Sequence, residues 1–234
     1  MKEKSGFLLY IDLLGYKDIL NKNNSEEDER LKSVLKHITE VYLNLNFTLA
    51  FGQCYNKKKM FQRFFSDNFL FVYESDRENI SDLRNLMFVA SYIQYQFLLT
   101  GILTRGAITY GTIYYTDNLV YGLDLIKVVE MEQSHKEPSV VVDDQFRTLF
   151  ENDKMIFTNT VDLFMVQPSS APDLNGCIES IKKYINNLNK SYVDGPVLDK
   201  INWVIEKVND YFGKKQKVQY ELKSETKYFL VEKE

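Results

Sequence analysis

The order of strand-like and helix-like stretches is the feature of this sequence that most constrains its fold. Short apolar runs, typical of buried strands, alternate with longer stretches whose apolar residues recur at helical spacing. In the middle of the chain two strand-like runs meet at the turn-forming residues Ser66, Asp67 and Asn68. Strands are predicted at 7–14, 60–65, 69–73, 103–109, 112–115, 138–143 and 161–166, and helices at 25–50, 82–100, 121–133 and 144–150. This order indicates an α+β fold in which helices pack on a ferredoxin-like βαββαβ sheet.

The last third of the chain has a different composition. The segment QPSSAPDLNG at 167–176 gathers proline, serine and asparagine, which is typical of a loop. Two helices, at 173–191 and 196–212, and a terminal hairpin with strands at 217–222 and 227–231 are predicted to follow.

Charge and cysteine usage exclude several classes of protein. The net charge of the 234-residue chain is −4, so no broad cationic surface for nucleic acid is expected. Cys54 and Cys177 form no paired motif, which suits a reducing cytosol. The apolar run at the N-terminus is interrupted by Asp12 and Lys17 and is too short for a membrane span or a signal peptide. We therefore expect a cytoplasmic protein without a nucleic-acid or membrane partner.

Two aspartates in strand-like surroundings are the strongest sign of chemistry. In a ferredoxin-like sheet the first strand lies beside the central hairpin, so Asp12 and Asp67 are predicted to converge. Two carboxylates that lie close repel each other unless a cation separates them. Hard oxygen ligands favour Mg²⁺ or Mn²⁺, with substrate phosphates filling the remaining positions. After Asp12, residues 13–16 turn from strand to helix, where free backbone N–H groups and Gly15 would accept a phosphate. Taken singly, Asp12 also fits a helix cap and Asp67 a structural turn residue.

Together these motifs resemble the class III nucleotidyl cyclases. The matching pieces are DLLGY at 12–16, Asp67 in the hairpin with Ser66 where the family has glycine, RGAITYG at 105–111, and the helix at 122–132 that ends in Met-Glu. The variants FSDN and RGAI are similar to those of the pyrimidine cyclases of bacterial Pycsar antiphage systems. The resemblance covers most of residues 5–166 and the tail.

The resemblance implies one domain over residues 1–234. Its parts would be a core at 5–166, a helical insertion at 167–213, and a hairpin at 214–234 that completes the core sheet. It also implies a homodimer with active sites at the interface, and a downstream effector that binds the cyclic nucleotide product.

The resemblance further implies a reaction and a set of site residues. A pyrimidine nucleoside triphosphate, UTP favoured over CTP, would be converted to the 3′,5′-cyclic nucleotide and pyrophosphate. Two Mg²⁺ or Mn²⁺ ions would be held by Asp12, Asp67 and the carbonyl of Leu13. The triphosphate would be bound by Leu14, Gly15, Tyr16 and Lys17.

Two arginines, and one difference from the purine cyclases in the last helix, bear on specificity and catalysis. Arg63 stands where purine cyclases place a base-reading lysine, and its guanidinium donors suit O4 of uracil; it also fits a solvated cation at a strand edge. Arg105 is the candidate to offset charge on the triphosphate, the alternative being an ion pair with Asp or Glu within the sheet. The Asn and Arg that purine cyclases carry in the last helix correspond here to Ile126 and Glu130. A purine cyclase and an inactive nucleotide-sensing domain of the same fold stay open as alternatives.

Overall fold

The computed structural model describes residues 1–15, 32, 35–36, 38–40, 60–99, 102–116, 118–146, 161, 175–176, 178–179, 181–182, 195–213, 219–224 and 228–233. Its strands are β1 (Lys2–Leu13), β2 (Met60–Phe65), β3 (Asn68–Glu74), β4 (Thr104–Tyr115), β5 (Val120–Tyr121), β6 (Val140–Val142), β7 (Tyr220–Ser224) and β8 (Tyr228–Glu232). Its helices are α3 (Ile80–Leu98), α4 (Leu123–Ser134), the 3₁₀ turn η3 (Asp144–Phe146), α7 (Gly195–Val208) and the π-helical η5 (Asn209–Gly213). The predicted helix at 25–50 is helical at the described positions 32, 35–36 and 38–40.

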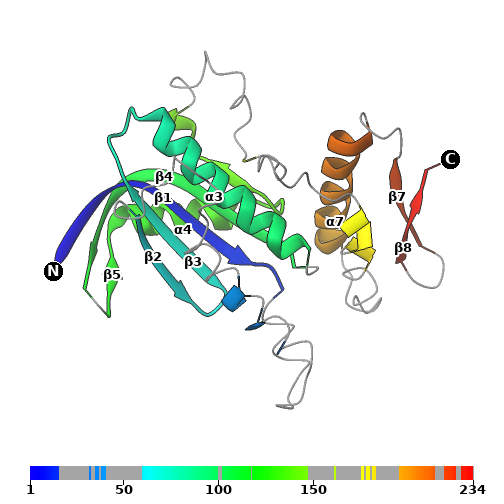
Figure 1. The fold of residues 1–234 in the computed structure, drawn as a ribbon, viewed down its shortest axis with the longest axis horizontal. Helices are drawn as coiled ribbons and strands as arrows, with labels where there is room; N and C mark the ends of the chain where they lie inside the picture. Colours follow the sequence, from blue (N-terminus) through cyan, green and yellow to red (C-terminus); the bar gives the residue numbers. More distant parts are fainter. Residues whose placement is uncertain are drawn as a thin grey trace.

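The main sheet has the order β2-β3-β1-β4-β5, and β6 joins the other part of β4 (Figure 1). Strands β2, β3, β1 and β4 are antiparallel to their neighbours, whereas β6 runs parallel to β4. In this order β1 and β2 run in the same direction with β3 between them, and β3 and β4 do the same with β1 between them. That is the split arrangement of a ferredoxin-like βαββαβ core. The predicted α+β fold is therefore confirmed.

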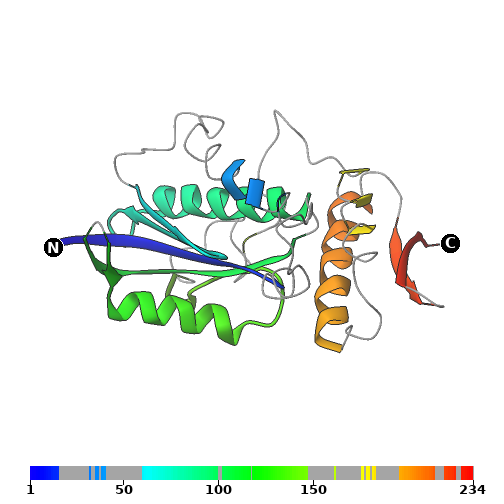
Figure 2. The ribbon, with the colours of Figure 1, turned by 90° about the horizontal axis from the view of Figure 1, so that it is seen from below.

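The two faces of the sheet are covered by different helices. Figure 2 shows α3 on one side of the sheet and α4 on the other. Side chains alternate along β1, so that Phe7, Leu9 and Ile11 join the large core under α3. The residues between them face the α4 side, where Tyr10 packs with Ala107 and Val128. The site described below lies on this α4 face, because Asp12 follows Tyr10 by two positions.

Strand β4 differs from its prediction. The sequence predicted two strands, at 103–109 and 112–115, and Gly111 between them fitted either a turn or close packing. In the structure β4 is continuous, and Gly111 pairs with Gly6 of β1. A Cβ at Gly111 would lie 2.1 Å from Cγ of Asp124, whose carboxylate accepts the N–H of Thr112 at 2.8 Å. Gly111 thus leaves room for the first turn of α4 instead of reversing the chain.

The C-terminal hairpin also differs from its prediction. β7 and β8 pair with each other in a separate two-stranded sheet, and within the described residues they do not extend the main sheet. The reason is their attachment to the end of α7. Oδ1 of Asn209 accepts a hydrogen bond from the N–H of Tyr220, and Nδ2 of Asn209 donates to the carbonyl of Tyr220, both at 2.8 Å. Tyr220 and Leu222 then pack against a second apolar cluster, which contains Ile201 and Val204 of α7.

The predicted helices of the last third are present where the structure describes them. Residues 175–176, 178–179 and 181–182 are helical, and α7 with η5 matches the stretch at 196–212. Figure 1 shows α7 and the hairpin at the end of the molecule opposite the N-terminus. Of the strand predicted at 161–166 only Val161 is described, and its N–H donates to the carbonyl of Val140 at 2.7 Å. No helix in the described ranges is long and apolar enough to span a membrane.

Candidate functional site

The end of β1 brings the two predicted aspartates to one place. Asp12 pairs with Asn68 of β3 on one side and with Arg105 of β4 on the other. The N–H of Leu13 donates to the backbone carbonyl of Asp67 at 3.0 Å. Asp67 is thus one residue away from the position opposite Asp12, although the two are far apart in the sequence.

Asp67 lies in the tight turn between β2 and β3. Phe65 and Asn68 are the last paired residues, so Ser66 and Asp67 form a two-residue loop. Ser66 has a φ of 58°, a left-handed conformation that glycine adopts most readily. A positive φ at the first loop residue, without one at the second, is the signature of a type II′ hairpin turn. Asp67 is partly exposed at the tip of this turn, where a cation can reach its carboxylate.

A hydrogen-bonded chain holds the carboxylate of Asp67. The hydroxyl of Tyr10 donates to Oδ1 of Asn68, and Nδ2 of Asn68 donates to Oδ1 of Asp67 at 3.0 Å. Burial raises the pKa of the Tyr10 hydroxyl to about 12, and three nearby carboxylates add to the rise, those of Asp12, Glu132 and Asp67. Asp12 and Asp67 therefore act on the same hydroxyl, and negative potential concentrates at this end of the sheet.

Sequence reasoning had not assigned a role to Tyr10 or Asn68. The signal for Tyr10 was the alternation of a strand, since it lies two residues before Asp12 and so on the same face. Asn68 is the residue that directly follows Asp67 in the predicted turn.

Arg105 is engaged by the end of α4. Its Nε donates to Oε1 of Glu132 at 2.5 Å, and one terminal nitrogen donates to the carbonyl of His135 at 2.9 Å. The side chain of Glu132 is only 4% exposed, so this ion pair is largely shielded from solvent. The predicted alternative, an ion pair with an acidic residue, is confirmed, although the acid comes from a helix and not from the sheet.

The predicted phosphate-binding turn is described as far as Gly15. The N–H of Leu14 donates to the carbonyl of Leu103 at 2.9 Å, which continues the pairing of β1 with β4. Gly15 has a φ of +78°, and a Cβ placed there would meet no described atom within 4 Å. The need for glycine at this position therefore comes from the backbone conformation. Tyr16 and Lys17 lie outside the described residues.

Arg63 of β2 lies on the same face of the sheet as Tyr10 and Asp12. It pairs with Leu70 of β3, which in turn pairs with Tyr10 of β1, so the three side chains form one row across the sheet. Its guanidinium carbon lies 4.8 Å from the centre of the Phe61 ring. Strand β3 thus separates Arg63 from the strand of Asp12. Arg63 lies near the end of β2 that leads into the β2–β3 turn.

The donor set fits a divalent cation that is shared with phosphates. Within the described residues no group of three or more His, Cys, Asp or Glu side chains is arranged to hold a metal ion. Mg²⁺ is usually bound by one or two carboxylates together with substrate phosphates and water. Asp12 and Asp67 supply two such carboxylates, whereas the nearby Glu132 is paired with Arg105.

Comparisons with known proteins give similarity in structure alone. No family model and no curated protein matches the chain. One similar solved structure is the catalytic core of a rhodopsin-guanylyl cyclase with converted specificity in complex with ATPαS, with 14% identity over 64% of this chain and 83% of that chain and a TM-score of 0.44. Another is a class III adenylyl cyclase-like ATP-binding protein from Pseudomonas aeruginosa, with 12% identity over 91% of this chain and 44% of that chain and a TM-score of 0.42.

Proposed function

We propose that the chain is a metal-dependent nucleotidyl cyclase that acts on a pyrimidine nucleoside triphosphate, with UTP favoured over CTP. The observation that carries the proposal is the meeting of Asp12 and Asp67 at one end of the sheet, through the hydrogen bond from Leu13 to the backbone of Asp67. By its resemblance to the Pycsar cyclases, the protein would generate the signal of an antiphage system, and an effector would bind the product.

The residues at this end of the sheet suit cyclisation. Asp12, Asp67 and the carbonyl of Leu13 would hold two Mg²⁺ or Mn²⁺ ions. When bound, such ions lower the pKa of an attacking hydroxyl and neutralise phosphate charge. The left-handed turn at Gly15, with Leu14 and the adjoining Tyr16 and Lys17, would receive the triphosphate.

The base would be read from β2. Arg63 carries only donors, which match the carbonyl O4 of uracil but not the amino group of cytosine. Arg63 is in line with Tyr10, which lies two residues before Asp12 on the same face of the sheet, and this position supports the assignment. Arg105 is held by Glu132, so a role on the triphosphate requires that this ion pair opens.

The site would be completed by a second copy of the chain. Ile126 and Glu130, at the positions of the missing Asn and Arg, are both exposed on α4. Large apolar side chains are exposed at the start of α4 and just before it, and we call them the exposed apolar patch: Leu119, Tyr121, Leu123 and Ile126. Exposed apolar residues of this kind mark interaction surfaces. A homodimer through α4 would bury the patch and bring the two α4 helices to the opposite sites.

The test is product formation from each nucleoside triphosphate. The purified chain is incubated with ATP, GTP, CTP and UTP in turn, with Mn²⁺, and products are identified by mass. Cyclic UMP is the expected main product. Asp12→Asn and Asp67→Asn should each lower the rate about a thousandfold, because each removes a metal ligand. Asp76→Asn, an exposed aspartate beyond the other end of β3, is the matched control and should keep full activity.

The same experiment separates the alternatives. A cyclic purine nucleotide as the main product would replace the pyrimidine assignment with a purine cyclase. Absence of any cyclic product with all four substrates, at a protein concentration that ensures dimer formation, would favour the inactive sensing domain. Near-normal turnover of Asp67→Asn would contradict the metal site itself.

A further inference from the structure

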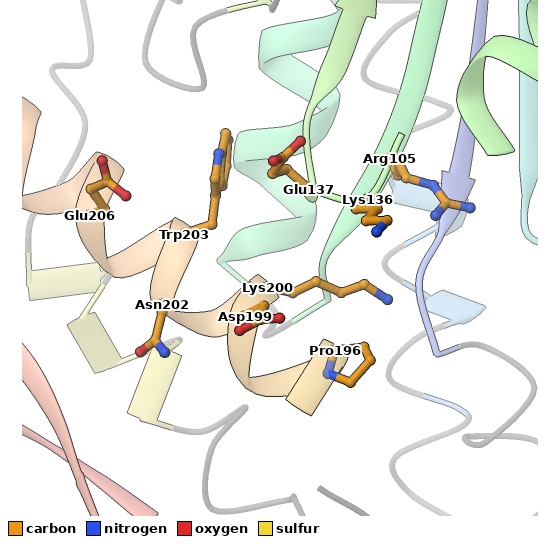
Figure 3. A pocket seen from close by; sticks show the side chains of 9 residues that line it. All are labelled: Arg105, Lys136, Glu137, Pro196, Asp199, Lys200, Asn202, Trp203 and Glu206. Carbon is orange, nitrogen blue, oxygen red and sulfur yellow. The ribbon is translucent and has the colours of Figure 1, made fainter. Parts of the chain in front are cut away.

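A cavity lies between α7 and the main sheet. It has a volume of about 610 Å³, which is within the usual range for small-molecule sites. One wall is α7, with Lys200, Trp203 and Glu206, and the other is formed by Arg105 and the turn at Lys136 and Glu137 that follows α4 (Figure 3). Of the candidate cyclase residues that the structure describes, Arg105 alone lines it.

Three cations gather at one side of this cavity. Figure 3 shows the ends of Arg105, Lys136 and Lys200 pointing to the side nearer the sheet. Arg105 is neutralised by Glu132. Among the described residues, the side chains of Lys136 and Lys200 have neither an ion pair nor a hydrogen bond. Two lysine side chains that face a cavity and have no described partner leave a position suited to an anion.

The other side of the cavity offers a ring and acceptors. Trp203 stands there with Glu206, as Figure 3 shows. Asp199 also lines the cavity, and Glu137 is already paired with His135 at 3.1 Å. An indole ring stacks on planar ligands, and carboxylates accept from hydroxyl groups.

We propose that this cavity binds a nucleoside phosphate, with the phosphate at Lys136 and Lys200, the base on Trp203, and the ribose hydroxyls at the carboxylate of Asp199, which lines the cavity from α7. An anionic group, a planar ring and hydroxyl donors are the three chemical features that the cavity matches. The site is separate from the metal site, since neither Asp12 nor Asp67 lines it.

Occupation of the cavity has a direct route to the first site. Arg105 lines the cavity and pairs with Asp12 across the sheet. Leu14, next to Gly15, packs against the apolar cluster that includes Ile201 of α7. A ligand in the cavity would contact both Arg105 and α7, the elements next to the Asp12 position, and we expect it to regulate the first site from there.

The single tryptophan provides the measurement. Trp203 is the only tryptophan in the chain and lines the cavity, so indole fluorescence of the protein reports on the surroundings of this one residue. AMP and UMP are titrated without divalent metal, beside adenosine and uridine, which lack the phosphate, and pyrophosphate, which lacks the ring. The two monophosphates should change the fluorescence saturably, and the three partial ligands should bind about tenfold more weakly or worse.

Matched variants locate the ligand. Lys136→Gln and Lys200→Gln should each weaken binding about tenfold, as expected for the loss of one charged hydrogen bond. Lys200→Arg keeps the charge and should retain binding. Lys223→Gln, an exposed lysine of β7 outside the cavity, is the control and should bind like the unchanged protein.

Several results would overturn the proposal. They are the absence of a saturable change, unchanged binding by Lys136→Gln and Lys200→Gln, or equal affinity for pyrophosphate and AMP. Binding that requires Mn²⁺ and is lost in Asp12→Asn would place the ligand at the metal site instead. The expected binding persists in an Asp12→Asn, Asp67→Asn double variant, so the cavity and the cyclase proposal can fail separately.

Discussion

At the scale of single residues, the hydroxyl of Tyr10 is a positioning group for the proposed metal site. It holds Asn68, which holds the carboxylate of Asp67. Tyr10→Phe should therefore raise the Mn²⁺ concentration needed for half-maximal cyclase activity about tenfold, because one hydrogen bond that orients a ligand is lost.

The control for this prediction is Tyr110→Phe. The hydroxyl of Tyr110 donates to the carbonyl of Ser75 at 3.0 Å, and its ring packs in the core on the α3 side. Both variants lose a partly buried hydroxyl bond, so both should lose some stability. Only Tyr10→Phe should change the metal dependence, and an equal change in both would assign Tyr10 a purely structural role.

The backbone conformation of Ser66 should lower the stability of the folded protein by a measurable amount. A left-handed backbone costs a non-glycine residue about 1 kcal/mol, and Ser66 has a φ of 58°. Ser66→Gly should raise the free energy of unfolding by up to about 1 kcal/mol, measured by urea denaturation. Ser81→Gly, at an exposed position of α3, should lower it, since glycine disfavours a helix. A loss of stability in Ser66→Gly would show that the serine side chain is needed in the turn.

At the scale of elements, Asp143 joins α4, β4 and the end of β6. Its carboxylate accepts from Lys127 of α4 at 2.5 Å and from Thr109 of β4 at 2.7 Å. Burial acts to raise the pKa of Asp143, but the hydrogen bonds from Lys127, Thr109 and the backbone of Gln145 outweigh it, and the pKa lies below its ordinary value of 3.8. The ionised carboxylate therefore stabilises the folded state above the ordinary pKa, and this contribution is lost as the pH falls through the lowered one.

Asp143→Asn tests this junction. The variant should be about 2 kcal/mol less stable than the unchanged protein at neutral pH, the value typical of hydrogen bonds to a charged group. The difference should shrink as the pH falls below about 4, where the unfolded carboxyl becomes protonated. Urea denaturation at several pH values measures it, with the exposed Asp210→Asn as control. A difference that is the same at every pH would mean that the charge of Asp143 has no part in it.

The elements also show what the sequence could and could not predict. Periodicity located the strands and helices of the core, and the turn residues located the β2–β3 hairpin that carries Asp67. The sequence pattern could not predict the continuity of β4, because this depends on the packing of Asp124 against Gly111, a contact between residues far apart in the sequence. The separate sheet of β7 and β8 was likewise missed, since it depends on the contact between Asn209 and Tyr220. Residue types alone suggested Arg105, but only the fold reveals its ion pair with Glu132.

At the scale of the whole molecule, three features meet at one end of the sheet. Asp12 lies at the end of β1, and Asp67 lies beside it in the β2–β3 turn. Leu14, which follows β1, packs against the second apolar cluster, and α7 contributes to that cluster. The C-terminal elements α7, β7 and β8 therefore lie at the proposed active end of the sheet, which fits the proposed regulatory role of the cavity at α7.

The exposed apolar patch on the outer side of α4 leads to the prediction at this scale. Leu123 is 83% exposed and Ile126 is 55% exposed, which is costly for large apolar side chains unless a partner covers them. We expect the protein to be a dimer in sedimentation velocity experiments. Leu123→Glu should make it a monomer, because it places a charge in a buried apolar contact. Its circular dichroism should not change, since the side chain of Leu123 is 83% exposed.

Loss of the dimer should also remove activity, since each proposed site is completed by the partner copy. Leu123→Glu should therefore lower the cyclase rate, and raising the protein concentration should restore part of it by mass action. Leu35→Glu is the matched control, because Leu35 is also an exposed leucine, at 45%, and lies outside the patch. It should keep both the dimer and the activity. A monomeric wild-type protein with full activity would contradict a shared site and leave Asp12 and Asp67 to act within one chain.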